Sequence, residues 1–388
     1  MPAISSLNGK KIFDSRGSET IEATLTLDNG TASSVSLPQA VSRGKNEAVY
    51  LSTEEALKNL KEIITPALCG MDIFEQEKID KKLIELDGTA NKSKLGANAI
   101  LGASLASARA SAKSANKELW QRFSEIYGAK PPRRPRLFIN VIEGGLHSLG
   151  NLRFQEYLII PQAESFAESM KVGQEMHVGL KEKLIELNGE NGAILGDEGG
   201  YAADLEGDLK PFELIREVAK NLGLEDKIKF GLDAAASNIQ DSPENLAASY
   251  QKMFSDFSLF YLEDPFGEED FASFARLKKE LPNVFITGDD LTATNLKKME
   301  EAKFRDSVNG VIIKPNQIGT VTETLEAIKK AREWNWLVVV SHRGGETEDD
   351  FIADLAYGVG ADGLKLGSPS RPERLAKYHR LLAIEKNK

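Results

Sequence analysis

Six apolar runs in the second half of the chain each end on a charged or ionisable residue, at intervals of 23 to 30 residues. The runs are IKFGLD ending at Asp233, LFYLE at Glu263, VFITGD at Asp289, NGVIIK at Lys314, WLVVVSH at His342 and DGLK at Lys365. This interval fits one strand and one crossover helix, so the pattern predicts six βα units. Strand-like runs at 137–142 and 154–160, then helical stretches at 163–187 and 211–222, precede them. The order ββαα(βα)₆ supplies eight strands, which is enough to close a barrel.

The first 125 residues follow a different pattern. Apolar residues alternate along Thr20–Leu27 and again along Thr31–Leu37, with Asn29-Gly30 between them, which is a strong hairpin signal. Ser52-x-x-Glu55 is a capping box that predicts a helix through Ile64, and the stretch 96–116 predicts a closely packed helix of small residues. We therefore expect an N-terminal α+β domain over residues 1–126. The proline- and arginine-rich segment 129–136 would link it to a barrel domain over residues 137–388.

Composition narrows the class of protein. The 388 residues carry a net charge of −10, which argues against nucleic acid or an anionic membrane as the main partner. No run approaches 18 apolar residues, and the N-terminus lacks an apolar signal core. A single cysteine, Cys69, suits a reducing compartment. We expect a cytoplasmic two-domain enzyme that needs local positive charge or a metal to bind a small anionic substrate.

The three acids at successive strand ends predict a metal site. Active sites of (β/α)₈ barrels lie at the C-terminal ends of the strands. Asp233, Glu263 and Asp289 would repel one another there unless a hard divalent cation lay among them, and Mg²⁺ suits carboxylate ligands. Each acid alone could instead cap the helix that follows it. Three acids at corresponding positions on successive strands favour metal binding over helix capping.

The basic strand-end residues predict acid–base chemistry. Lys314 follows the apolar residues 310–313, so burial near other cations would lower its proton affinity and let it act as a base. Its alternative role is a salt bridge to one of the acids. Lys365 and Arg343 could hold a substrate carboxylate and phosphate. Glu198 in a GDEGG loop, Glu156 on the second strand and His147 in a glycine-rich loop would each, taken alone, more often be structural. We assign no role to His177 or His379.

The chain resembles the enolases from end to end. The matching segments are FDSRG (13–17), DGTANKSKLGANAILGASLA (87–106), FINVIEGGLH (138–147), FQEYLIIP (154–161), GDEGGYA (196–202), LDAAAS (232–237), LEDPF (262–266), GDDLTATN (288–295), IKPNQIGT (313–320), SHRGGETEDDFIADLAYG (341–358) and LKLGSPSRPERLAK (364–377). The resemblance implies an enolase-type ββαα(βα)₆ barrel with a smaller N-terminal α+β domain. It also implies reversible dehydration of 2-phosphoglycerate to phosphoenolpyruvate, in a homodimer or a higher homo-oligomer.

The resemblance also implies a role for each matching site residue. Lys314 would remove the α-proton, and Glu198, supported by Glu156, would protonate the departing hydroxyl. Asp233, Glu263 and Asp289 would hold the Mg²⁺ that binds the substrate carboxylate, and Lys365 would offset charge on that carboxylate. The remaining positions would surround the substrate and its phosphate: Arg343, His342, His147 and Gln155.

Several residues depart from the family's pattern. The mobile loop PSGASTG, which carries a serine ligand to a second Mg²⁺, is PQAVSRG at 38–44, with Gln39 in place of a serine and Arg43 in place of a threonine. Gln39 could offer an amide oxygen to a cation, and Arg43 could meet the substrate phosphate. Gly344 replaces a phosphate-binding serine, and Glu143 replaces an asparagine. We expect the proton-transfer residues and first metal site to be retained, with altered phosphate binding and a weakened second site.

Three hypotheses follow. The first is a working enolase. The second is an enolase-like lyase or dehydratase that acts on a different carboxylate, which Gln39, Gly344 and Glu143 would favour. The third is a non-catalytic scaffolding protein, which the intact acids and Lys314 argue against.

Overall fold

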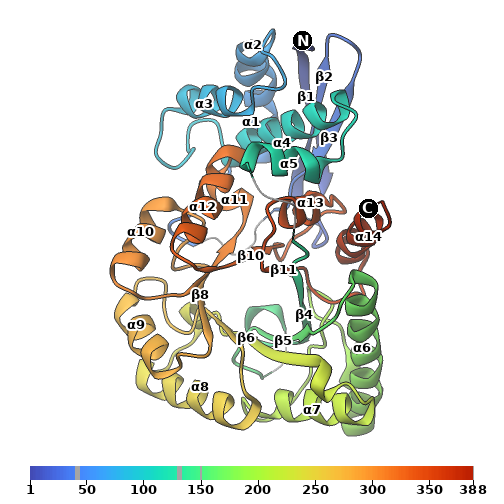
Figure 1. Cartoon of the computed structure of the whole chain (residues 1–388), viewed down its shortest axis with the longest axis vertical. Helices are drawn as coiled ribbons and strands as arrows, with labels where there is room; N and C mark the ends of the chain where they lie inside the picture. The colour runs from blue at the N-terminus through green and yellow to red at the C-terminus, as the bar shows by residue number, and fades with distance from the viewer. Residues whose placement is uncertain (40–43, 129–132, 149–150, 388) are drawn as a thin grey trace.

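The computed structural model describes residues 1–39, 44–128, 133–148 and 151–387, and its larger part is a closed barrel of eight strands ringed by helices (Figure 1). The spatial order is β10-β11-β4-β5-β6-β7-β8-β9. The strands are β4 (Arg136–Glu143), β5 (Glu156–Pro161), β6 (Ile228–Asp233), β7 (Tyr261–Glu263), β8 (Phe285–Gly288), β9 (Gly310–Ile313), β10 (Leu337–Ser341) and β11 (Gly363–Lys365). The predicted order ββαα(βα)₆ is confirmed.

One strand of the barrel runs opposite to the others. β5 pairs antiparallel with both β4 and β6, whereas the other neighbouring strands are parallel. The first residue of β5, Glu156, therefore lies opposite Asp233 at the end of β6 and Glu143 at the end of β4. The inversion brings the start of β5 to the rim where the other strands end.

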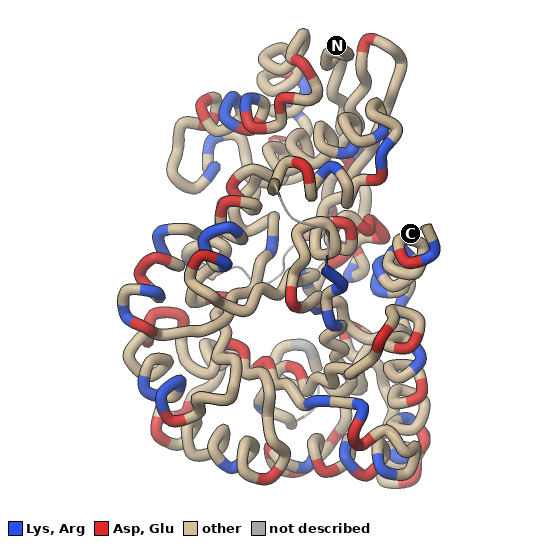
Figure 2. Tube along the Cα trace, in the orientation of Figure 1, with Lys and Arg blue, Asp and Glu red and all other residues tan. Residues whose placement is uncertain are grey.

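Helices surround the barrel because each βα unit returns along its outer face. They are α6 (Phe166–Asn188), α7 (Lys210–Asn221), α8 (Pro243–Phe257), α9 (Phe271–Glu280), α10 (Leu296–Phe304), α12 (Val321–Glu333), α13 (Phe351–Gly358) and α14 (Pro372–Lys386), and the short α11 (Pro315–Ile318) directly follows Lys314. The barrel interior is filled by apolar side chains such as Phe138, Leu158, Tyr261 and Ile312. Charged residues of both signs are spread over the outer helices (Figure 2).

The N-terminal part is a three-stranded antiparallel sheet covered by helices. The strands are β1 (Ile4–Phe13), β2 (Glu19–Leu27) and β3 (Ala32–Ser36), and the helices are α1 (Thr53–Asn59), the π-helix 60–64, α2 (Thr65–Leu68), α3 (Gln76–Asp87), α4 (Ala97–Ser114) and α5 (Leu119–Tyr127). The β2–β3 hairpin and the Ser52–Glu55 capping box are confirmed, with Glu55 N donating to Ser52 Oγ at 3.2 Å. The sequence analysis missed β1, because its polar middle interrupts the apolar alternation of an edge strand.

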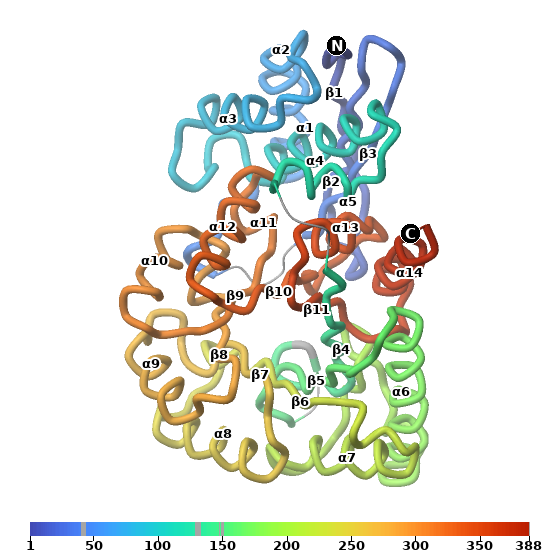
Figure 3. Tube along the Cα trace, viewed as in Figure 1, coloured from blue at the N-terminus to red at the C-terminus, as the bar shows by residue number. Residues whose placement is uncertain are grey.

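The small residues of α4 let this helix approach the sheet closely. A Cβ atom at Gly102 would lie 3.0 Å from Ala23 Cβ on β2. The sheet and its helices rest on the barrel beside α12 and α13, as the tube in Figure 3 shows. The proposed linker includes residues 129–132, which lie outside the described residues, and the domain boundaries at 126 and 137 stay a prediction. Within the described ranges, no helix combines the length and apolar character needed to span a bilayer.

Candidate active site

A polar cavity of about 260 Å³ opens at the end of the barrel where the strands terminate. Its walls include these predicted site residues: Gln155, Glu156, Glu198, Asp233, Asp289, Lys314, His342, Arg343 and Lys365. Acidic side chains outnumber Lys and Arg among the described residues that line it. The barrel thus brings residues from all along the second half of the chain into one small volume.

Lys365 lies among three carboxylates at the base of this cavity. Its Nζ is 2.7 Å from Asp233 Oδ2, 3.0 Å from Glu263 Oε2 and 3.1 Å from Glu156 Oε1. Burial works against the charge of Lys365, but these acids outweigh it and raise the pKa of the ammonium well above its ordinary value. Burial, followed by the charge of Asp233, raises the pKa of Glu263 to about 8. The cluster therefore holds more acids than Lys365 can neutralise, and this excess favours a proton on Glu263.

Lys314 forms an ion pair with Asp289, whose other oxygen accepts from Gln317 Nε2 at 3.0 Å. Burial would lower the pKa of Lys314, but Asp289 outweighs it and the pKa is raised. The expected loss of proton affinity is therefore wrong for this arrangement, and the alternative salt bridge to an acid is found. The physical reason is that the carboxylate of Asp289 is directly available to the lysine.

The donor set suits a hard divalent cation. The available ligand atoms are buried carboxylate oxygens, and Glu156 Oε2 is buried without a hydrogen-bond partner among the described residues. In the described part of the chain, two groups of acids and histidine lie close enough to hold an ion: Glu156, Glu198 and His342, and Asp264, Asp289 and Asp290. Neither group is the predicted set of Asp233, Glu263 and Asp289; Lys365 contacts the first two of these acids and Lys314 the third. The chemistry of the site fits a metal, while its lysines neutralise part of the same acid cluster.

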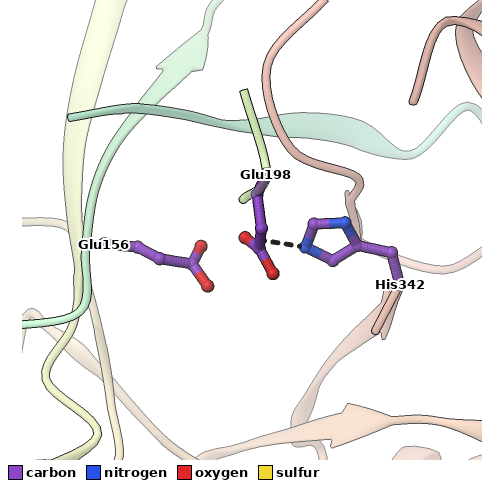
Figure 4. A group of neighbouring side chains, drawn as sticks. All are labelled: Glu156, Glu198 and His342. Atoms are coloured by element: carbon purple, nitrogen blue, oxygen red, sulfur yellow. Dashed lines mark ion pairs between the residues drawn. The ribbon is translucent and has the colours of Figure 1, made fainter. Parts of the chain in front are cut away.

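His342 contacts Glu198, and its hydrogen bonds show which ring nitrogen carries the proton. His342 Nε2 lies 3.2 Å from Glu198 Oε2 (Figure 4), and Arg374 Nη1 donates to His342 Nδ1 at 2.6 Å. Because a guanidinium only donates, Nδ1 accepts and Nε2 carries the proton that points to Glu198. Burial lowers the pKa of His342 to about 4, so the imidazole is neutral at pH 7. In Figure 4 the carboxylates of Glu156 and Glu198 extend toward the same space.

Arg343 is bound by an acid from the N-terminal part of the chain. Its Nη1 and Nη2 donate to Glu47 Oε2 and Oε1 at 2.9 and 3.1 Å, and both side chains are buried. Gly44 and Glu47 line the same cavity. Glu47 was not predicted as a site residue, because nothing local in the sequence indicates that residue 47 meets residue 343.

A second N-terminal residue covers the loop after β10. Arg16 Nη2 is 2.6 Å from Asp197 Oδ2, next to Glu198. A Cβ atom on Gly344 would lie 2.9 Å from Arg16 Nη2. The guanidinium of Arg16 therefore occupies the space beside Gly344, where the family serine would carry its side chain.

The remaining predicted residues lie at or beyond the edge of the described site. Gln155 lines the cavity, with its Nε2 3.4 Å from Asp233 Oδ2. Gln39 is half-buried, and its carbonyl oxygen would lie 2.5 Å from a Cβ on Gly345. His147 ends a short 3₁₀ turn, Gly145–His147, but its side chain is not described. Arg43 lies outside the described residues.

The fold and this cavity define an α/β-barrel enzyme with acid–base groups at its strand ends. The family description "Enolase, C-terminal TIM barrel domain" matches residues 134–388, and "Enolase, N-terminal domain" matches residues 4–123. An enolase of Metallosphaera sedula is 40% identical over 402 residues, covering 99% of this chain and 96% of that protein. An enolase of Methanopyrus kandleri is also 40% identical, covering 100% and 96%, and one of Mastigamoeba balamuthi is 38% identical, covering 99% and 96%. The chain belongs to the enolase family.

Proposed function

We propose that this protein catalyses the reversible dehydration of 2-phosphoglycerate to phosphoenolpyruvate, as a carbon–oxygen lyase that uses Mg²⁺. The convergence of Lys314, Glu198, Lys365 and the buried acids in one cavity is the observation that carries this proposal. Likeness to enolases over nearly the whole chain supports it. That likeness does not favour the alternative of an enolase-like enzyme for a different carboxylate.

The proposed reaction begins with removal of the α-proton by Lys314. A proton next to a carboxylate is a very weak acid, so the base must be neutral and the developing negative charge must be stabilised. Lys314 becomes a base when its Nζ gives up its proton and its bond to Asp289. When bound, a divalent cation held by Asp233, Glu263 and Asp289 would stabilise the negative charge that develops on the substrate carboxylate. Lys365 adds a fixed positive charge beside the same acids.

Glu198 then protonates the leaving hydroxyl, which departs as water while the double bond forms. Neutral His342 donates to one oxygen of Glu198, and Asn140 Nδ2 lies 3.3 Å from the same oxygen, Oε2. These two donors fix the direction of the carboxyl group, so its proton is delivered to one position. Glu156 extends into the same space and supports this arrangement.

The phosphate end of the site is proposed to differ from that of other enolases. We assign Arg343 and His342 to the substrate's anionic groups, as the resemblance implies. Gln39, Arg43 and Gly344 differ from the family at the loop that carries the second metal and at the phosphate. We therefore propose one strong Mg²⁺ site and a weakened second one.

We also propose a cytoplasmic homodimer. The single free cysteine, Cys69, is exposed, which suits a reducing compartment, and the resemblance implies a dimer or a higher oligomer. Sedimentation velocity at micromolar concentration tests the assembly, and a monomer at all concentrations would contradict it.

An assay with 2-phosphoglycerate tests the activity directly. Purified protein is mixed with 2-phosphoglycerate and increasing Mg²⁺, and the absorbance of phosphoenolpyruvate is followed. We expect turnover that saturates with Mg²⁺ and falls by at least about 10²-fold in Lys314→Ala, since the base is lost. No turnover at millimolar Mg²⁺ would sink the proposal. Turnover of other hydroxy acids in its place would support the alternative substrate.

A further inference from the structure

A buried glutamate at the end of β4, Glu143, holds the loop that carries Glu198. Its carboxylate accepts from Glu198 N at 3.1 Å and from Gly200 N at 2.6 Å. Glu143 is fully buried and lies opposite Glu156 in the barrel sheet. The backbone of Glu198 is thus tied directly to the barrel rim by the side chain of Glu143.

The same loop is fixed from its other side. His177 Nε2 donates to Gly199 O at 3.0 Å, and Ser370 Oγ donates to the same oxygen at 2.9 Å. Space beside Glu143 is tight, because a Cβ on Gly200 would lie 3.0 Å from Glu143 Cγ. The loop therefore cannot turn without breaking hydrogen bonds to Glu143, His177 or Ser370.

Glu143 can hold these amides without being ionised. Two nearby buried carboxyl groups do not readily ionise together, because each negative charge disfavours the other. Burial, followed by the charge of Glu198, raises the pKa of Glu143 to about 8, while the two amide donors favour its ionised form. The carboxyl group is therefore mostly protonated at pH 7, and its Oε1 accepts from both amides.

We propose that Glu143 is a positioning residue for the reaction: its carboxyl group fixes the acid-bearing loop through the amides of Glu198 and Gly200, and so sets where the Glu198 carboxyl meets the departing hydroxyl. This inference rests on the proposed function. It extends that function by assigning a role to an acid that stands where the family pattern has an asparagine.

Two variants test the role of the acceptor oxygen. Glu143→Gln keeps an acceptor oxygen, while Glu143→Ala removes it. Exposed Glu225→Gln is the matched control. For each, kcat and KM for 2-phosphoglycerate are measured from about pH 6 to about pH 9, since Glu198 must be protonated and Lys314 neutral in this direction. Circular dichroism and the melting temperature show whether each variant folds.

The positioning role predicts a loss in kcat that the conservative variant rescues. In Glu143→Ala we expect kcat to fall at least about tenfold with KM nearly unchanged, because the loop that carries Glu198 loses its acceptor, while Glu143→Gln keeps most of the wild-type kcat. Equal losses in the Ala and Gln variants, or a change in KM alone, overturn the positioning role. Glu225→Gln should match the wild type throughout.

The positioning role is also tested without activity. Amide hydrogen exchange across residues 196–202 should be at least about tenfold faster in Glu143→Ala than in the control, because two protecting hydrogen bonds are lost. Unchanged exchange overturns the positioning role. If Glu143→Ala does not fold, Glu143→Leu is compared in its place, because it also lacks the acceptor oxygen and fills more of the same space. A wild type that is inactive on 2-phosphoglycerate but shows the exchange difference would refute the proposed function and leave the positioning role standing.

Discussion

Two adjacent glycines after β10 differ in how much room they have for a side chain. A Cβ on Gly345 would lie 2.3 Å from Asp14 Oδ2 and 2.5 Å from the backbone oxygen of Gln39. A Cβ on Gly344 would meet only the flexible guanidinium of Arg16, at 2.9 Å. Gly345 is required because it packs closely against the N-terminal segment. At Gly344, the space for a side chain is occupied by the guanidinium of Arg16.

We therefore expect Gly345→Ala to destabilise the protein by about 2 kcal/mol, because backbone and Asp14 must move apart to admit a methyl group. Gly344→Ala should cost less than about 1 kcal/mol, since Arg16 can swing away. Urea unfolding followed by circular dichroism measures both. Equal losses in the two variants would contradict this account of the loop.

At the scale of elements, an acid on one helix caps another helix far along the chain. Asp80 on α3 accepts from Thr322 N at 2.9 Å at the start of α12, and also from Ser104 Oγ at 2.6 Å and Gln76 Nε2 at 3.0 Å. The amide groups at a helix start need such acceptors. Asp80 thereby joins the N-terminal helices to the barrel, but its charge is fully buried.

Burial raises the pKa of Asp80 from 3.8 to about 6, so stability should depend on pH. The raised value means that the folded protein binds the proton more tightly than the unfolded chain. The contribution of this proton to stability is complete below about pH 4 and is lost as pH rises through about 6, by roughly 3 kcal/mol. Asp80→Asn should flatten that slope, as read from unfolding free energies at several pH values. An unchanged slope would show that Asp80 does not titrate in this range.

A partly buried ion pair joins the same two parts of the molecule. Arg109 on α4 donates through Nη2 to Asp349 Oδ1 at 2.7 Å, and Asp349 Oδ2 accepts from Ser36 N at 2.8 Å. Arg109→Met would leave the buried Asp349 without its cation, so we expect a loss of about 3 kcal/mol in unfolding free energy. The exposed pair of Arg305 and Glu301 is the control, and Arg305→Met should change stability by less than about 1 kcal/mol. A loss in Arg109→Met no larger than in the control would rule out a structural role for the pair.

At the scale of the whole molecule, the excess of buried acids should couple cation binding to stability. A divalent cation that binds only the folded state stabilises it by about 2.7 kcal/mol at 100 times its dissociation constant. We expect the melting temperature to rise with added Mg²⁺ and to fall again with a chelator. Glu263→Gln should lose most of this response while remaining folded. A melting temperature that does not respond to Mg²⁺ in the wild type would contradict a metal site among these acids.

The sequence by itself determined the eight barrel strands, the β2–β3 hairpin, the capping box at Ser52 and the residues at each strand end. These features follow from local periodicity, spacing and capping, which a short stretch of chain expresses without its neighbours. The sequence did not predict β1, because the polar residues in its middle interrupt the local apolar alternation, although its partner β2 follows directly along the chain.

Tertiary structure decided which of these residues contact one another. It brought Glu47 to Arg343 across 296 residues, set Lys365 among Asp233, Glu263 and Glu156, and gave Glu143 the amides of the acid-bearing loop. It also paired Lys314 with Asp289, against the expectation of a free base. Such pairings depend on barrel closure and on the inverted β5, which bring distant strand ends to one rim, and no local pattern encodes them.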